Sequence, residues 1–88
     1  MRRVIFSRIF EKDVKLMKKR GYVMEKLGAA LRTLAETGKL EERFKDHPLR
    51  GNYQGYRECH LEPDWLLIYK ITDEELSLSR TGTHSDLF

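Results

Sequence analysis

The chain has 88 residues, the length of one small domain, and its 17 lysines and arginines exceed its 14 aspartates and glutamates to give a net charge of +3. A protein that holds long nucleic acid unaided usually has a denser basic face, so this charge favours a local patch or a guiding partner. The single cysteine, Cys59, excludes an internal disulfide and a paired-cysteine zinc site, so a reducing cytoplasm is the expected location.

The chain begins with a segment that predicts a strand. Residues 3–7 are a short stretch containing the β-branched pair Val4 and Ile5, which is typical of a strand. Basic residues precede these apolar ones, as in an export signal, but Ser7 and Arg8 end the apolar run far below signal-peptide length. Export is therefore not expected.

Two amphipathic helices are predicted next, the first ending at Gly21 and the second near Gly38. In each helix, apolar residues recur at i, i+4 and i+7, which places them on one face. The stripes are Phe10, Val14 and Met17 in the first helix, and Leu27, Leu31 and Leu34 in the second. The basic run Lys18-Lys19-Arg20 is expected to be a solvated helix end. The two helices are expected to pack as a pair.

Beyond Gly38 the apolar period changes, and three strands are predicted after a loop rich in glycine and proline. They span residues 56–61, 65–71 and 76–83. The middle run is continuously apolar, as expected of a strand covered on both faces, and it is far shorter than the roughly 20 residues of a membrane helix. No membrane segment is therefore expected.

The predicted order of elements is β-α-α-β-β-β, without a linker or an internal repeat, so residues 1–88 are expected to form a single domain. The fold class is α+β, with an antiparallel sheet built on a three-strand meander and two helices packed on one face. The opposite face of the sheet is expected to be free for a ligand.

All three histidines, His47, His60 and His84, lie in the second half of the chain. Histidine can both donate and accept a proton near pH 7, so this grouping in a small basic protein indicates proton-transfer chemistry, with RNA as the substrate. A metal site is not expected, because Cys59 and His60 point to opposite faces of a strand and no HExxH motif is present. No cofactor is expected either.

A set of motifs in the second half of the chain resembles the YafQ branch of the RelE/ParE superfamily of bacterial toxins. The motifs are Lys45-Asp46-His47-Pro48-Leu49, Gly55-Tyr56-Arg57, His60-Leu61-Glu62-Pro63-Asp64-Trp65, Leu67-Ile68-Tyr69-Lys70, Arg80-Thr81-Gly82-Thr83-His84 and the final Leu87-Phe88. The resemblance spans nearly the whole chain. It implies a compact RelE-like fold, cleavage of messenger RNA in the ribosomal decoding site, and silencing by a cognate antitoxin. The expected partners are therefore the ribosome, mRNA and an antitoxin, and no direct DNA binding is expected of the chain alone.

The resemblance also implies the residues of the site: His47, His60, Asp64 and His84 as the catalytic set, with Trp65 and Phe88 supporting the site or touching RNA. Metal-free RNA cleavage needs a base to deprotonate the ribose 2′-hydroxyl and an acid to protonate the leaving 5′-oxygen. We expect His84 to be the general acid. His60 with Asp64 is expected to activate the hydroxyl or hold the phosphate, and His47 to be a second proton acceptor or an orienting group. The predicted first products are a 2′,3′-cyclic phosphate and a free 5′-hydroxyl, and DNA is predicted to be inert.

Several of the candidate residues have a structural alternative. Asp64, which follows a proline, could be only a turn residue, and Trp65, which opens the most apolar strand, could pack in the core. Phe88 could either fill the core or stack on a nucleotide. Arg80 has the strand parity of the apolar leucines before it and could form an ion pair at a buried edge, but a contact with phosphate is favoured.

Two other functions stay open at this point: a non-catalytic toxin of the ParE kind that binds DNA gyrase, and a small RNA-binding module without chemistry. The grouped histidines argue against both, because neither function needs proton donors at fixed positions. Full toxicity after His84→Ala or His60→Ala would favour the binding alternative.

Overall fold

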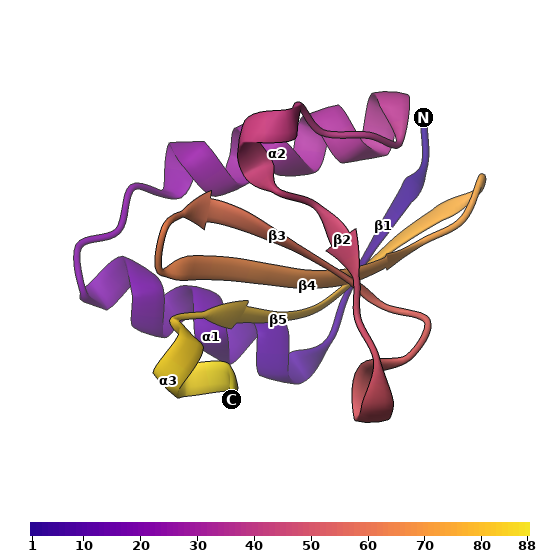
Figure 1. Cartoon of the computed structure of the whole chain (residues 1–88). Helices are drawn as coiled ribbons and strands as arrows, with labels where there is room; N and C mark the ends of the chain where they lie inside the picture. The colour runs from indigo at the N-terminus through magenta and orange to yellow at the C-terminus, as the bar shows by residue number, and fades with distance from the viewer.

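A computed structural model describes all residues, 1–88, and confirms the predicted order of elements, to which it adds a short strand, two 3₁₀ turns and a short final helix (Figure 1). The elements are β1 (Arg3–Phe6), α1 (Arg8–Lys19), α2 (Met24–Thr37), the 3₁₀ turn η1 (Glu42–Phe44), β2 (His47–Pro48), the 3₁₀ turn η2 (Gly51–Tyr53), β3 (Arg57–Glu62), β4 (Trp65–Ile71), β5 (Glu75–Gly82) and α3 (His84–Leu87).

The sheet has five strands in the order β1-β5-β4-β3-β2. Strands β3, β4 and β5 form the predicted antiparallel meander. Strand β1, however, runs parallel to β5, with Val4 opposite Leu76. The prediction of a fully antiparallel sheet is therefore wrong at this edge. A parallel pair needs a long crossover connection, and the helices and the meander between these two strands provide it.

The other edge strand, β2, cannot be predicted from periodicity, because it has only two residues. It pairs antiparallel with β3, where His47 lies opposite Glu58. Immediately after β2, the Leu49 N–H donates to the Tyr56 carbonyl at 2.9 Å, which closes the loop of residues 49–56. The short strand thus fixes His47 against the sheet.

Helices α1 and α2 cover one face of the sheet, as predicted (Figure 1). The buried stripe residues Phe10, Met17, Leu27 and Leu34 all lie in the core beneath them. On β4, Leu67 and Tyr69 face the same core, whereas Leu66 and Ile68 belong to a second buried cluster on the other face. Strand β4 is therefore covered on both sides, as its continuous apolar run predicts.

The face opposite the helices is only partly free. Leu66 and Ile68 are covered there by Leu87 of α3 and by three side chains of the loop between β2 and β3, namely Leu49, Tyr53 and Tyr56. The expectation that this face is free for a ligand therefore holds only in part, because the second apolar surface of the meander also has to be removed from water.

A β-bulge at Ser79 turns the Arg80 side chain to the face of the sheet opposite the one that strand parity predicts. Tyr69 pairs with Leu78, but the preceding Ile68 pairs with Arg80, so Ser79 is an extra residue on β5. Because a bulge places two residues opposite one, the alternation of side chains slips. Arg80 therefore shares the face of Ile68 and not the helix-covered face of Leu78.

The ends of the two long helices follow from their terminal residues. Ser7 begins α1, and its hydroxyl accepts a hydrogen bond from the Phe10 N–H at 2.9 Å. Gly38 ends α2 with a φ of 79°, and a Cβ there would meet the Arg2 guanidinium at 2.7 Å. No helix has the length and apolar character needed to cross a membrane.

Candidate active site

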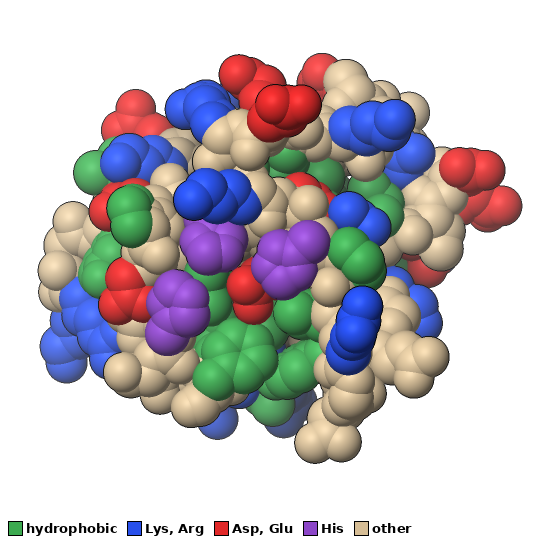
Figure 2. Space-filling view, in the orientation of Figure 1, with side chains coloured by type: hydrophobic (Ala, Val, Ile, Leu, Met, Phe, Trp, Pro, Cys, Tyr) green, Lys and Arg blue, Asp and Glu red, His purple; other side chains and the backbone are tan.

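The three histidines come together on the face of the sheet opposite α1 and α2, where they lie side by side (Figure 2). His47 comes from β2, His60 from β3 and His84 from the first position of α3. The ring centroids of His47 and His60 are 6.5 Å apart, and those of His60 and His84 are 5.9 Å apart. We call these three residues the histidine row. The structure thus brings together all three imidazoles that the sequence singles out.

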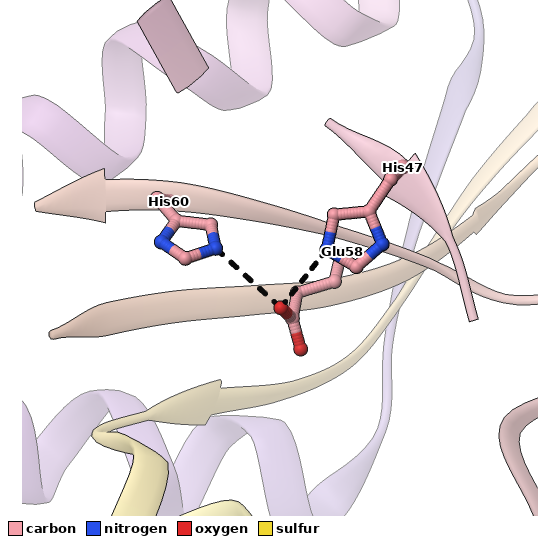
Figure 3. Close-up of side chains that lie close together, drawn as sticks. All are labelled: His47, Glu58 and His60. Atoms are coloured by element: carbon pink, nitrogen blue, oxygen red, sulfur yellow. Dashed lines mark ion pairs between the residues drawn. The ribbon is translucent and has the colours of Figure 1, made fainter. Parts of the chain in front are cut away.

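Glu58 lies between two of these rings and was missed in the sequence-based site. Its side chain is only 8% exposed, and its carboxylate lies 3.3 Å from Nε2 of His47 and 3.5 Å from Nε2 of His60 (Figure 3). A buried carboxylate is costly unless polar groups lie beside it, and the two imidazole nitrogens are the groups in that position. The signal for it is present in the sequence, because residues two apart on a strand share a face, and Glu58 precedes His60 by two.

Both ring nitrogens of His47 face acceptors. Nδ1 lies 3.1 Å from the carbonyl oxygen of Pro48, and Nε2 lies beside the Glu58 carboxylate. His47 is therefore held at the edge of the site by a polar partner at each ring nitrogen.

Asp64 lies in the turn between β3 and β4 and is bonded to His84. Its Oδ1 accepts from the backbone N–H of His84 at 2.8 Å and lies 2.5 Å from Nδ1 of the same residue. These bonds, the backbone one foremost, lower the pKa of the Asp64 carboxyl below its ordinary value. The partnership expected between Asp64 and His60 is not what the structure shows: Asp64 orients His84, and Glu58 is the carboxylate beside His60.

His47 is also held in place through the residue before it. The Asp46 carboxylate accepts from Nε of Arg57 at 2.6 Å and, through its other oxygen, from the Tyr69 hydroxyl. Burial first, and then the bond to Asp46, raise the pKa of Tyr69 well above its ordinary value, so the phenol stays a donor. The preceding Lys45 adopts a φ of 50°, which turns the chain into this anchor.

The short helix that carries His84 is anchored at several points. The Thr83 hydroxyl and the Asp86 carboxylate form a capping box, and Leu87 is buried in the second cluster. Asp86 also pairs with Arg20 at the end of α1, with Nη1 to Oδ2 at 2.6 Å and Nη2 to Oδ1 at 3.2 Å. The bond from Arg20 is the main cause that lowers the pKa of Asp86 far below its ordinary value. Arg20 is therefore not merely a solvated helix end.

This anchor predicts a pH-dependent difference in stability. Asp86→Asn removes the charge but keeps an oxygen for the Thr83 N–H. Because the pKa of Asp86 is depressed on folding, its charge stabilises the fold fully above the pKa of an unfolded aspartate, about 4, and the contribution is lost as the pH falls through the folded value. We expect the variant to be less stable than the wild type near neutral pH, and the difference to shrink below about pH 4.

Urea unfolding of the two proteins over this pH range measures the difference directly, since all other carboxyl groups titrate in both. A difference that is constant across the whole range would contradict the assignment of the charge to the anchor.

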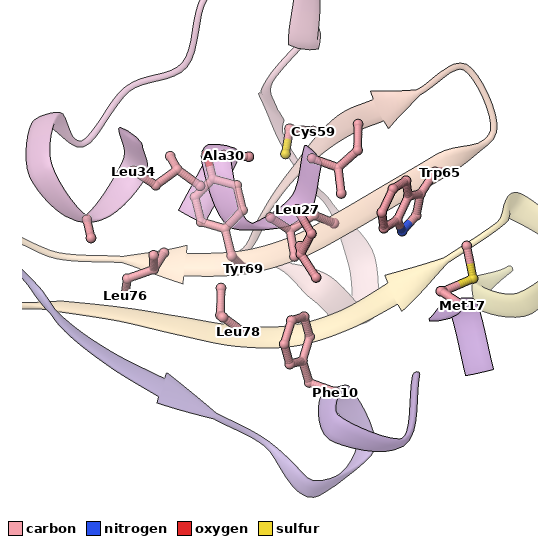
Figure 4. Close-up of a cluster of buried hydrophobic side chains, with 13 residues drawn as sticks. Phe10, Met17, Leu27, Ala30, Leu34, Cys59, Trp65, Tyr69, Leu76 and Leu78 are labelled. Carbon is pink, nitrogen blue, oxygen red and sulfur yellow. The ribbon is translucent and has the colours of Figure 1, made fainter. Parts of the chain in front are cut away.

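The structure places Trp65 in the core and not in the site. Its side chain is 0% exposed and lies among the buried hydrophobic side chains of the core (Figure 4). Its ring packs edge-on against the Tyr22 ring, with centroids 5.2 Å apart, and its indole N–H donates to the Thr81 hydroxyl at 2.9 Å. This cluster lies on the helix-covered face, away from the histidine row. Of the two roles considered for Trp65, the structure supports packing in the core. A side chain with no exposed surface does not contact RNA.

Arg80 reaches the histidine-bearing face, but its guanidinium is already engaged. Nε and Nη2 bond the two oxygens of Asp13 at 2.7 and 3.2 Å, and Asp13 also accepts from the Thr81 N–H at 3.1 Å. Asp13 thereby provides a hydrogen-bond acceptor for the backbone at the edge of β5, at a point where β1 has already ended. The ion pair is the alternative that was less favoured from the sequence, and a phosphate contact by Arg80 stays a prediction. Phe88, in contrast, is 64% exposed beside His84.

One subset of the site has the composition of a metal centre. The ligand atoms of His47, Glu58 and His60 all lie within 4.8 Å of one another. Imidazole nitrogen and carboxylate oxygen are ligands that zinc and copper accept. These three residues are the ones that could hold an ion.

Solved structures share the fold of this chain over its full length. The toxin in the Escherichia coli DinJ-YafQ complex superposes with a TM-score of 0.92 at 47% identity, with 100% of this chain and 99% of that chain covered. A metal-bound toxin from Helicobacter pylori superposes with a TM-score of 0.91 at 41% identity, with 100% of both chains covered. The sheet with two helices behind it and a histidine row in front thus defines a small bacterial toxin with a RelE-like fold.

Sequence comparisons narrow this class. The curated E. coli (strain K12) protein "mRNA interferase toxin YafQ" is 49% identical over 88 residues, which cover 99% of this chain and 96% of that protein. The family model for the YafQ bacterial toxin of type II toxin-antitoxin systems matches residues 2–88. The chain therefore belongs to the YafQ family of type II toxins, which confirms the resemblance drawn from the motifs.

Proposed function

We propose that this toxin is an mRNA interferase, an endoribonuclease that cuts messenger RNA on the ribosome by metal-independent acid-base chemistry. The observation that carries the proposal is the histidine row, with Glu58 beside two rings and Asp64 bonded to the third. Attack by a ribose 2′-hydroxyl requires a base and an acid close to the scissile phosphate, and the neighbouring imidazoles of the histidine row can fill these roles. The relatives named mRNA interferases support the same activity.

The roles of the residues follow from their partners. His84 is the general acid, because Asp64 binds Nδ1 and leaves Nε2 on an exposed ring for the leaving 5′-oxygen. His60, beside Glu58, accepts the proton of the 2′-hydroxyl. His47, held at both ring nitrogens, is the second proton acceptor or orients the substrate. Arg80 and Phe88 support the site from the same face.

The partners proposed for the chain are mRNA, the ribosome and a cognate antitoxin protein, and the proposed location is the cytoplasm. The E. coli relative is solved as a complex with DinJ, which supports an antitoxin for this toxin too. A net charge of +3 is low for a protein that binds mRNA unaided, so the orientation of the message is assigned to the ribosome.

Induced expression followed by mapping of transcript 5′ ends tests this function. We expect new ends within translated messages, bearing 5′-hydroxyl groups and matched by 2′,3′-cyclic phosphates upstream. In a purified translation system, cleavage is expected to persist in EDTA at a concentration that leaves ribosomal magnesium saturated but removes zinc and copper.

Three outcomes would contradict the proposal. Growth arrest without new ends would favour binding to DNA gyrase. Protection of RNA without cleavage would favour a binding module. Activity abolished by the chelator and restored by zinc would replace the metal-free mechanism with one that uses His47, Glu58 and His60 as ligands.

A further inference from the structure

The face that carries the histidine row also carries a line of aromatic rings, of which the proposed function names only Phe88, as a support of the site. Tyr53, at the end of η2, lies 6.0 Å from the Phe88 ring at an angle of 71°, and 6.2 Å from the Tyr56 ring at 87°. We call Phe88, Tyr53 and Tyr56 the aromatic row. In Figure 2, hydrophobic side chains border the purple histidines on this face.

The two rows are joined at α3. His84 and Phe88 are four residues apart, and the Phe88 N–H donates to the His84 carbonyl at 2.9 Å, so their side chains rise from the same turn. A base bound at Phe88 and Tyr53 would thus belong to a nucleotide beside the phosphate at His84. The two rings meet edge to face, and Phe88 is exposed while Tyr53 is half-buried.

We infer that Tyr53 and Phe88 bind the base of the nucleotide adjacent to the scissile phosphate, so that Tyr53 determines base preference at that position. This inference rests on the proposed cleavage of mRNA. Bases stack on aromatic rings whatever their sequence, and the strength of stacking differs between bases, so a ring beside the cut biases which nucleotide is accepted.

The loop that holds Tyr53 is ordered by its own hydrogen bonds, without RNA. The Tyr56 N–H donates to the Tyr53 carbonyl at 2.9 Å, and the Leu49 N–H donates to the Tyr56 carbonyl at 2.9 Å. Tyr53 also packs on the second buried cluster, which fixes the ring from below. A ring that is already ordered loses little entropy on binding, which suits it to select a ligand.

Charges around the aromatic row favour nucleic acid over an apolar peptide as its occupant. Lys70 Nζ lies 5.7 Å from the centroid of the Tyr56 ring, and Arg50, at the start of η2, is exposed. Cations bordering stacking rings are the arrangement by which proteins hold a single strand, the cations binding phosphates and the rings binding bases.

The test compares the cleavage sites of the wild type with those of Tyr53→Leu, Tyr53→Phe and Tyr53→Trp on the same transcript pool. Tyr53→Leu keeps an apolar side chain on the buried cluster but removes the ring. We expect it to slow cleavage by about 5- to 150-fold, unevenly across the bases at the adjacent position. Tyr53→Phe should keep the wild-type pattern, and Tyr53→Trp should keep or sharpen it. Gln54→Ala, an exposed neighbour in the same loop, is the matched control.

Other results of this comparison would overturn either the role of Tyr53 or the cleavage activity itself. A Tyr53→Leu protein with wild-type rates, or with rates lowered equally at every base, would overturn the inference and leave Tyr53 a packing residue only. Urea unfolding of each variant supplies the folded fraction by which its rate is corrected. Absence of new ends with the wild type would instead overturn the cleavage activity, and this inference with it.

Discussion

Replacing His84 with alanine should lower the rate of RNA cleavage by about 100- to 10,000-fold while the fold is retained. The ring is 54% exposed and contacts the rest of the site through Asp64, so its loss leaves no cavity. What is lost is the proton for the leaving 5′-oxygen. Single-turnover cleavage of ribosome-bound message, together with growth arrest on induction, measures the effect.

The neighbouring exposed residue provides a matched control. Ser85→Ala changes the same turn of α3 without touching the histidine row and should retain wild-type activity. Asp64→Asn should fall between the two, because the amide can still accept the His84 N–H but no longer stabilises the protonated ring. Wild-type cleavage by His84→Ala would remove His84 from the mechanism altogether.

The elements of the fold are predictable where the signal is local. The spacing of Phe10, Val14 and Met17 predicts α1, and the apolar run of β4 predicts a strand buried on both faces, because each pattern reports directly on what the side chains contact. The parallel pairing of β1 with β5 has no such signal. It depends on which edge of the meander is vacant after the helices have packed, and only the assembled sheet determines that.

The site, like the fold, is predictable only where the signal is local. The motifs show which residue types belong to the site, but they do not show which of these residues pair with one another. Asp64 and His84 are 20 residues apart and meet only because the β3–β4 turn and α3 lie at the same end of the sheet. Arg20 and Asp86, 66 residues apart, pair for a similar reason.

Two residues show how strand parity helps and how it fails. Glu58 could have been found from the sequence, since it shares a strand face with His60 two residues later. Arg80 could not, because the bulge at Ser79 shifts the alternation that parity assumes. Bulges leave little trace in side-chain type, so the face of a residue beyond one has to come from the structure.

Replacing Trp65 with alanine should destabilise the fold by about 3–5 kcal/mol, which is a large share of the roughly 5–15 kcal/mol that holds a small domain together. The indole is 0% exposed and packs against Tyr22, so the deletion leaves a cavity between the sheet and the helices. Loss of activity in this variant should follow the loss of folded protein. Urea unfolding, combined with cleavage rates corrected for the folded fraction, separates the two effects.

Trp65→Phe distinguishes a core residue from one that touches RNA. Phenylalanine fills most of the space but cannot donate to the Thr81 hydroxyl, which keeps its own bond to the Leu66 carbonyl at 2.7 Å. We expect a cost of about 1–2 kcal/mol in stability and a wild-type cleavage rate per folded molecule. If the folded variant instead cleaved tenfold or more slowly, Trp65 would have to reach the RNA, which its position beneath α1 and α2 does not allow without a rearrangement of the core.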